Sequence, residues 1–258
     1  MARLNWGVTE PDTLDAFLGG RLQIRQPRRG YRAGVDPVLL AASITARPGQ
    51  SVLELGCGVG TAILCLGRRL PGLAMTGVEL QPDYAELARH NAKANDLPLD
   101  VITADLLALP AELRQRRFDH VMMNPPYFDR DAGTSAADPG RDTALGGATP
   151  LADWLDIGAR RLAPKGYLTL IQRMERLPEA LTALQGRLGS IVIRPVAGRP
   201  ERAPGLFILR ARQEGRAPFR LLPTLVMHIG ATHDGDKDSY TPQVAAILRN
   251  GADLPMTG

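Results

Sequence analysis

Residues 51–60 read SVLELGCGVG, and this stretch decides the fold. Its first half is a short apolar run that predicts a buried strand, and its second half spaces Gly56, Gly58 and Gly60 ahead of a helical pattern. Glycines at such a turn let the backbone bend sharply and let a ligand lie against it, because no Cβ intervenes. The stretch therefore predicts a strand–loop–helix unit with a ligand at the loop.

Strands and helices alternate regularly from this stretch to residue 172. We expect strands at 51–55, 74–80, 100–104, 118–123 and 167–172, with helices at 61–70, 82–95, 107–116 and 151–162. Short apolar strands separated by such helices indicate parallel βαβ units. Strands expected at 190–196, 205–212 and 219–228 follow closely, which indicates antiparallel pairing. The prediction is an α/β, Rossmann-like, doubly wound, seven-stranded mostly parallel sheet with an antiparallel C-terminal strand pair.

Three segments are expected along the chain. Residues 1–48 form an N-terminal extension packed on the core, in which residues 22–25 and the segment around Tyr31 form a hairpin. A helix capped by Asp36 then runs to about residue 47. Residues 49–230 form the main domain, which includes an aperiodic loop at 128–148, and residues 231–258 form a tail with a short helix after Tyr240.

Composition excludes several classes of protein. The chain has 258 residues, of which 44% are hydrophobic, and this is ample for one α/β domain. No apolar run approaches the ~20 residues of a membrane span, and the first residues lack a signal-peptide pattern. We therefore expect a cytoplasmic protein without a membrane partner. Cys57 and Cys65 are not spaced as a metal site, and neither are the histidines, so no metal is expected.

Arginines are distributed unevenly in a chain whose net charge is only +4. Residues 21–32 and 187–220 are rich in arginine, and a third group lies at 114–117. A solvated surface explains these groups as well as a partner does. The alternative is nucleic acid, because guanidinium groups pair with phosphates and stack on unpaired bases. The candidates for RNA contact are Arg25, Arg28, Arg29, Arg32 and Arg202.

Four polar residues, Glu54, Glu79, Asp105 and Asn124, close successive predicted strands. All four should reach the carboxyl edge of the sheet, where open α/β folds bind ligands. A dehydrogenase would space its glycines as GxGxxG to hold a pyrophosphate, whereas this loop reads GxGxG. S-adenosylmethionine has no phosphate but carries a sulfonium and an amino group, which suit nearby carboxylates. It is the predicted cofactor, with candidate contacts at Glu54, Gly56, Cys57, Gly58, Gly60, Glu79, Leu80, Asp105 and Leu106.

The tetrapeptide Asn124-Pro125-Pro126-Tyr127 follows the fourth strand. Taken alone it is a strand terminator, since two prolines cannot continue a ladder. Beside a cofactor loop it suits methylation of an amino nitrogen. The Asn124 side-chain oxygen and the Pro125 backbone carbonyl can both accept from the amine, so that its lone pair points along the methyl axis. Tyr127 offers a ring for stacking, which Phe128 would extend.

These motifs together resemble the class I methyltransferases that act on amino nitrogens, over residues 31–172. The segments YRAGVD at 31–36, FLGGR at 17–21 and PERAPG at 200–205 resemble the bacterial enzymes that methylate adenine 37 of tRNA-Val on N6. The resemblance implies S-adenosylmethionine as cofactor, tRNA as partner, and catalytic roles for Asn124, Pro125, Pro126 and Tyr127.

Three other functions remain open. Glutamine-N5 protein methyltransferases share the tetrapeptide, but they normally carry a separate helical N-terminal domain. Guanine-N2 rRNA methyltransferases often have Phe after the prolines and a duplicated domain. A non-catalytic RNA-binding module is the third alternative, and an intact Asn124 and Tyr127 argue against it.

Overall fold

A central mixed sheet forms the middle of the molecule in the computed structural model, which describes residues 12–127, 149–230 and 239–257. The strands lie in the order β10 (Arg220–Leu221), β8 (Gly189–Ala197), β9 (Leu206–Arg212), β7 (Leu162–Arg173), β6 (Phe118–Met123), β3 (Ser51–Leu55), β4 (Ala74–Glu79) and β5 (Asp100–Thr103), and β11 (Leu225–Val226) also pairs with β8. Neighbours from β5 to β7 are parallel. Strand β9 is antiparallel to both β7 and β8. The predicted Rossmann-like, doubly wound sheet is confirmed, but it has nine strands in the described ranges rather than the seven expected, because short strands β10 and β11 extend its edge.

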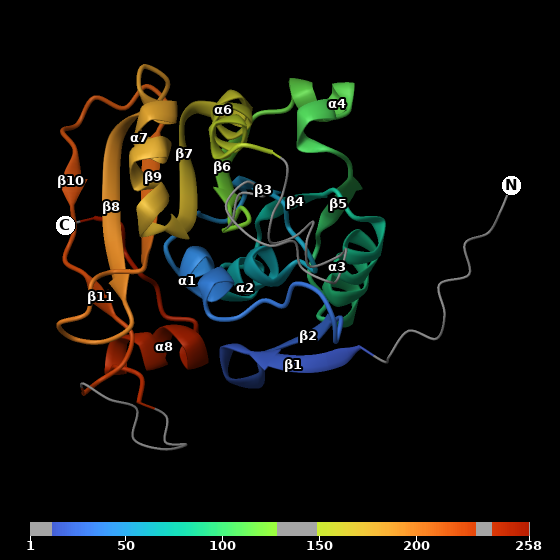
Figure 1. The fold of residues 1–258 in the computed structure, drawn as a ribbon. Helices are drawn as coiled ribbons and strands as arrows, with labels where there is room; N and C mark the ends of the chain where they lie inside the picture. The colour runs from blue at the N-terminus through green and yellow to red at the C-terminus, as the bar shows by residue number, and fades with distance from the viewer. Residues whose placement is uncertain (1–11, 128–148, 231–238, 258) are drawn as a thin grey trace, which may run out of the picture.

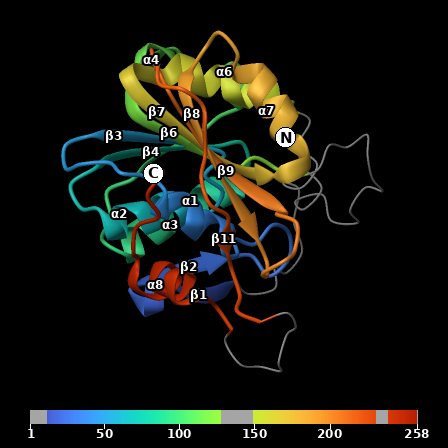
Figure 2. The same cartoon turned by 90° about the vertical axis from the view of Figure 1, so that its left-hand side faces the viewer.

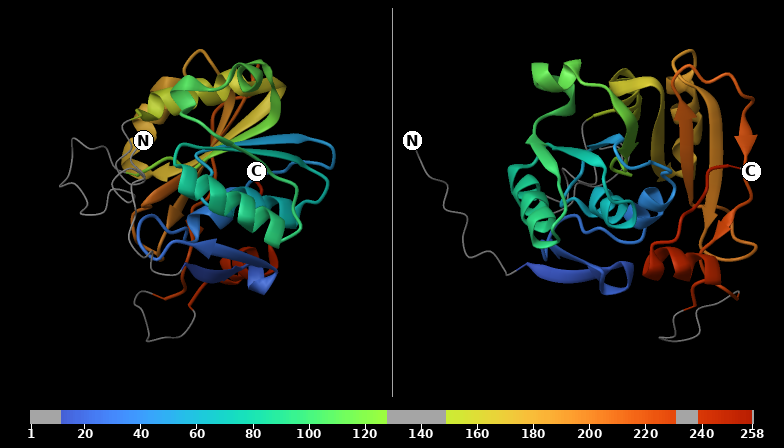
Figure 3. Two further views of the ribbon diagram at one scale, coloured as in Figure 1. Left: turned by 90° about the vertical axis from the view of Figure 1, so that its right-hand side faces the viewer. Right: turned by 180° about the vertical axis from the view of Figure 1, so that it is seen from behind.

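Helices cover both faces of this sheet (Figures 1 and 2). One face carries α1 (Asp36–Ala42), α2 (Thr61–Arg69) and α3 (Pro82–Ala94), and the other carries α4 (Ala111–Gln115), α6 (Leu151–Arg161) and α7 (Leu177–Leu184). Beyond α1–α3 lie the hairpin of β1 (Thr13–Phe17) and β2 (Leu22–Gln26) and the helix α8 (Pro242–Asn250), as Figure 3 shows. No helix in the described ranges is long and apolar enough to cross a membrane.

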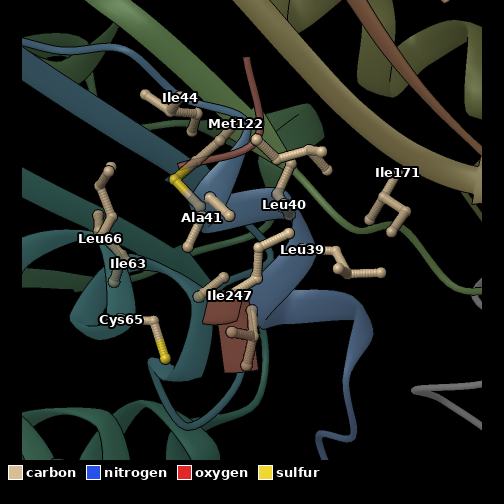
Figure 4. Close-up of a cluster of buried hydrophobic side chains, with 14 of the residues drawn as sticks. Leu39, Leu40, Ala41, Ile44, Ile63, Cys65, Leu66, Met122, Ile171 and Ile247 are labelled. Carbon is tan, nitrogen blue, oxygen red and sulfur yellow. The ribbon is translucent and has the colours of Figure 1, made fainter. Parts of the chain in front are cut away.

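Two hydrophobic clusters pack on the two faces of the sheet. Along β6, Met122 belongs to one cluster, whereas Val121 and Met123 belong to the other, because successive side chains of a strand point to opposite faces. Figure 4 shows the first cluster, where side chains of α1 meet those of α2, β6, β7 and α8. The loops at the strand ends therefore rise from a sheet that is buried on both faces.

The N-terminal hairpin differs from the predicted one. Strand β2 pairs with β1, and Phe17 lies opposite Leu22, so the segment around Tyr31 is not its partner. On the other edge of β2, two side-chain amides, of Asn91 in α3 and of Asn95 at its C-cap, accept from backbone N–H groups and donate to backbone carbonyls. These side chains satisfy the backbone groups that a third strand would use.

Prolines and side chains also move several predicted boundaries. The helix expected at 107–116 divides into a 3-10 turn and α4, because Pro110 lacks an N–H. Helix α1 ends at Ala42, where Arg69 donates to the Ala41 carbonyl at 2.8 Å. Pro223 separates β10 from β11, and both pair with β8 in parallel rather than antiparallel. The sequence interpretation included neither β1 nor α7.

Candidate active site

The carboxyl ends of β3, β4, β5 and β6 meet at one edge of the sheet. In the parallel register Glu54 lies opposite Gly77 on β4, and Glu79 lies opposite Thr103 on β5. Asp105 and Asn124 follow the ends of β5 and β6. The strand-end residues therefore share this edge, as their positions in the sequence predict.

The glycine loop has one packed side and one open side. Gly56, Gly58 and Gly60 have φ values of +66°, +54° and +86°, which L side chains rarely adopt. A Cβ on Gly56 would lie 2.5 Å from the Cη2 atom of Trp154 in α6, whereas a Cβ on Gly58 would meet nothing within 4 Å. Trp154 thus supports the loop from behind, and the face at Gly58 remains accessible to a ligand.

The two glutamates at this edge are buried and hold the loop backbone. Glu79 accepts from the N–H groups of Gly58 and Gln81, both at 2.9 Å, and Glu54 accepts from Ile63 at the start of α2 at 3.1 Å. Burial raises the pKa of Glu79 and raises that of Glu54 well above its usual value. A cation placed beside them would stabilise their charged forms.

The adenine end of the predicted cofactor site is more open. The Asp105 carboxylate accepts from the Leu107 N–H at 2.9 Å, and the residue is exposed. Leu80 is 53% exposed directly after Glu79, and Leu106 is half-buried beside Asp105. Cys57 is buried, and both cysteines are free. An apolar surface thus lies next to a carboxylate, a combination that accommodates a flat ring with an amino group.

The Asn124 side chain is bonded on one side only. Its Nδ2 donates to the Tyr31 hydroxyl at 3.4 Å, while its buried Oδ1 has no hydrogen-bond partner in the described part of the chain. Gln172, from the end of β7, donates through Nε2 to the backbone oxygens of Pro125 and Pro126, both at 3.3 Å. One buried acceptor is therefore unused, and the Pro125 carbonyl keeps a second lone pair.

Tyr127 is fixed at its hydroxyl and on its ring. The hydroxyl donates to Asp36 at 2.5 Å, and the Arg173 guanidinium lies 5.7 Å from the ring centroid. Burial, together with the nearby Asp36 carboxylate, raises the pKa of Tyr127. The helix cap predicted for Asp36 is wrong. Val35 is the N-cap of α1, and the Asp36 carboxylate reaches the site instead.

Sequence reasoning assigned no role at the site to Tyr31, Asp36, Gln172 or Trp154. A signal existed for three of them. Tyr31 and Asp36 lie in the YRAGVD segment, and Gln172 is a polar residue near the end of the next parallel strand, by the same rule that selected Asn124. Trp154 had no such signal, because its contact with Gly56 depends on the packing of α6.

The arginine candidates lie in different places. Arg25, Arg28 and Arg29 are exposed on β2 and the segment that leads to Tyr31. Arg202 is exposed in the loop between β8 and β9, at the carboxyl edge, whereas Arg32 pairs with Asp15 at 2.6 Å. The group at 114–117 precedes β6 and lies at the opposite edge.

Phe128 lies outside the described residues. No group of three or more metal-ligating side chains is found in the described ranges.

Comparison with known proteins identifies the family. Residues 34–138 match the model of the methyltransferase small domain. The tRNA1(Val) (adenine(37)-N6)-methyltransferase of Porphyromonas gingivalis is 32% identical over an alignment of 228 residues, which covers 83% of this chain and 88% of that protein. This chain belongs to the same methyltransferase family as that enzyme. The enzyme of the same name from Yersinia enterocolitica is 27% identical over 207 residues, or 77% of this chain and 80% of that protein.

Solved structures agree with the fold of the family. A predicted O-methyltransferase of Agrobacterium tumefaciens gives a TM-score of 0.69 at 24% identity, covering 85% of this chain and 98% of its own. The 16S rRNA N2 G1207 methyltransferase of T. thermophilus gives 0.54 at 19% identity, covering 78% of this chain and 50% of its own. The chain is thus a methyltransferase with a class I fold, as the sequence motifs predict.

Proposed function

We propose that this protein transfers a methyl group from S-adenosylmethionine to N6 of an adenine in tRNA, with adenine 37 of tRNA-Val as the target. The observation that carries the proposal is the buried Asn124 Oδ1, which has no partner among the described residues and lies at the same strand-end edge as the glycine loop. A buried acceptor without a partner is costly, and a bound amine would satisfy it. The names of the family's members supply the adenine and the tRNA.

The residues at the strand ends fit the cofactor. The open side of the glycine loop at Gly58 gives its backbone a close approach to a ligand, and Glu79 sits where a carboxylate can accept from ribose hydroxyls. Asp105 is exposed and available to an adenine amino group, and the apolar residues Leu80 and Leu106 follow the ends of β4 and β5. Glu54 lies beneath the loop and would act through its charge, because its carboxylate is buried. S-adenosylmethionine would supply an electrophilic methyl group on a sulfonium.

The chain's own residues would align the amine with that methyl group. An exocyclic amino nitrogen is a weak nucleophile because its lone pair is delocalised into the ring. Asn124 Oδ1 and the Pro125 carbonyl would each accept one N–H, which turns the lone pair toward the methyl carbon. Transfer would form the nitrogen–carbon bond as the carbon–sulfur bond breaks, and one proton would leave the product nitrogen to water. Tyr127 would stack on the base, with its ring held by Asp36 and Arg173.

The RNA would approach the carboxyl edge. An adenine in an anticodon loop must leave its stack to enter a pocket, and the adjacent phosphates then need cationic partners. Arg28 and Arg202 are exposed on two segments that reach this edge, and Arg25 and Arg29 belong to the same N-terminal group. Arg32 is a weaker candidate, since its guanidinium already pairs with Asp15.

A labelling experiment tests the proposal. The protein is incubated with S-adenosylmethionine carrying a tritiated methyl group, in parallel with total tRNA, with rRNA and with a release factor. We expect label in tRNA-Val as N6-methyladenosine after nuclease digestion. Label in release factor alone would replace the proposal with a glutamine-N5 activity. Label as N2-methylguanosine in rRNA would replace it with a guanine activity.

A further inference from the structure

Both acceptor groups at the site are held by residues outside the tetrapeptide. Tyr31 meets Asn124 from the segment between β2 and α1, and Gln172 meets Pro125 from the end of β7. We propose that Tyr31 and Gln172 are positioning residues for methyl transfer: Tyr31 turns the Asn124 amide so that its oxygen faces the amine, and Gln172 holds the Pro125 carbonyl beside it. This inference rests on the proposed function, because it takes an amino nitrogen as the acceptor.

The orientation of the Asn124 amide decides what the site can bind. A primary amide accepts at its oxygen and donates at its nitrogen. Because Nδ2 donates to the Tyr31 hydroxyl at 3.4 Å, Oδ1 is left without a partner among the described residues. If the amide were rotated by half a turn, its NH2 group would face the pocket and oppose the hydrogens of an amine. Tyr31 therefore controls whether Asn124 attracts or repels the substrate.

The Tyr31 hydroxyl keeps its proton and accepts from the Asn124 amide. A hydroxyl can donate or accept, so Tyr31 alone does not fix the amide. Burial raises the pKa of Tyr31, and the charges of Asp36 and Glu54 raise it further, so the hydroxyl keeps its proton. The lone pairs of the hydroxyl oxygen then remain for Asn124 Nδ2.

Tyr31 is itself anchored on a helix. Its backbone N–H donates to the Tyr84 hydroxyl at 3.0 Å, and Tyr84 is a buried residue of α3. The Tyr84 hydroxyl lies 3.5 Å from the Tyr31 carbonyl oxygen, to which it donates. The segment that carries Tyr31 is thus fixed to the layer of helices beneath the site, which gives the amide contact a rigid support.

Gln172 has an amide orientation that its neighbours determine. It is fully buried, and its Oε1 accepts from the Arg173 N–H at 2.8 Å. Nε2 must therefore point the other way, toward the Pro125 and Pro126 carbonyls at 3.3 Å. A carbonyl oxygen has two lone pairs, so this bond fixes the direction of the Pro125 carbonyl and leaves one lone pair for the amine.

The substitution Tyr31→Phe tests the first contact. It removes the acceptor for Asn124 Nδ2 while keeping the ring. We expect kcat to fall roughly 10–100-fold, by analogy with the loss of one polar contact at a reacting group. KM for tRNA and the calorimetric Kd for S-adenosylmethionine should stay within about threefold of the wild-type values, because the substitution removes no contact with the tRNA or with the cofactor. Tyr167→Phe, on β7, is the matched control and should match the wild type. An unchanged kcat, or an equal loss of cofactor affinity, would overturn the inference.

The substitution Gln172→Glu tests the second contact through pH. A glutamate can still accept from the Arg173 N–H, and when protonated it can also donate to Pro125. When ionised it loses that donation and repels the carbonyl. We expect kcat of this variant to fall as pH rises, through an ionisation that the wild type lacks, while Gln172→Met is impaired at every pH. Parallel pH profiles for Gln172→Glu and the wild type would contradict the role. If Gln172→Glu does not fold, Gln172→Met decides the role: a wild-type kcat in that variant would contradict it.

The assay separates this inference from the function on which it rests. The wild type is measured first with tRNA and with release factor. Transfer to release factor alone overturns the tRNA assignment, and the variants are then measured on that acceptor. Transfer to tRNA by the wild type and an equal rate for Tyr31→Phe overturn only the positioning role.

Discussion

At the amino edge of the sheet, Asp119 accepts from both the backbone N–H and the hydroxyl of Ser51 at 2.8 Å. At the carboxyl edge, Asn124 keeps a buried oxygen without a partner in the described part of the chain. Partial burial raises the pKa of Asp119, but its hydrogen bonds with Ser51 outweigh this effect and hold the pKa below its usual value. At the carboxyl edge, burial raises the pKa of Glu54 and of Glu79. The satisfied Asp119 thus contributes to the fold, whereas the unsatisfied Asn124 oxygen, at an edge where buried glutamates gather, indicates a ligand.

The largest expected effect is that of Asn124→Ala. It removes the acceptor oxygen at the carboxyl edge, and kcat should fall roughly 10²–10³-fold while the free energy of unfolding changes little. Asn124→Asp keeps an acceptor and should retain more activity than the alanine variant. Single-turnover methyl transfer measures the rate, and calorimetry with S-adenosylmethionine measures binding. Full turnover by the alanine variant would show that methyl transfer does not need the unpaired Asn124 oxygen at the carboxyl edge.

Glycines with positive φ at the two edges give the next comparison. Gly49→Ala, at the amino edge, meets open space, so only the left-handed backbone opposes it, at roughly 1–3 kcal/mol of stability. Gly56→Ala adds a clash with Trp154, so its loss should be larger by about 1–3 kcal/mol. Gly56→Ala should also weaken cofactor binding, whereas Gly49→Ala should leave cofactor binding intact. Urea denaturation and calorimetry measure the two effects, and equal stabilities for both variants would contradict the packing role of Trp154.

Arginines at the two edges should differ in RNA binding. Replacing both Arg28 and Arg202 with glutamate should weaken tRNA binding about tenfold or more and reduce the slope of log K against log salt by about two, because each phosphate contact contributes about one. The matched pair Arg114→Glu and Arg117→Glu, at the amino edge, should leave that slope unchanged. Filter binding from low to high salt measures both. Equal slopes for the two double variants would show that the RNA does not distinguish the edges.

The smallest effects concern pH. The folded-state pKa of Glu54 is raised, so its contribution to stability is present at low pH and is lost as pH rises through that pKa. Glu54→Gln should therefore raise the free energy of unfolding of the cofactor-free protein at pH 8, by about 1 kcal/mol, and less at pH 5. The pKa of Asp119 is lowered, so its contribution is present above the unfolded value and is lost as pH falls.

Asp119→Asn should accordingly have the opposite sign. It should lower stability at pH 7 by a few tenths of a kcal/mol, because the group is largely solvated and screened, and the loss should vanish near pH 3. Thermal denaturation of the two variants from pH 3 to 8 checks the pair. Curves of the same sign would show that the two carboxylates are not held in different environments.

The residues that the sequence identified are those whose positions follow from local rules. Glu54, Glu79 and Asn124 were found because parallel strands all end at one edge, so a position along the chain becomes a position in space. The partner of β2 was missed because asparagine side chains of α3, distant in sequence, replace a strand. Tyr31 and Asn124 are separated by 93 residues, and no periodicity reports such a contact. The domain boundaries at 48 and 230 stay a prediction.

Helix α8 and the residues after it close the layer that contains α1. The Leu254 N–H donates to the Ala42 carbonyl at 2.8 Å, and Val244 and Ile247 are fully buried in the cluster that α1 and α2 share. During synthesis on the ribosome, α1 emerges about 200 residues before these partners do, at the usual ~5–20 residues per second. The part of the α1 surface that α8 covers stays exposed for that interval, although α2, β6 and β7 emerge earlier. The nascent chain thus completes the layer that contains α1 only when α8 has left the exit tunnel.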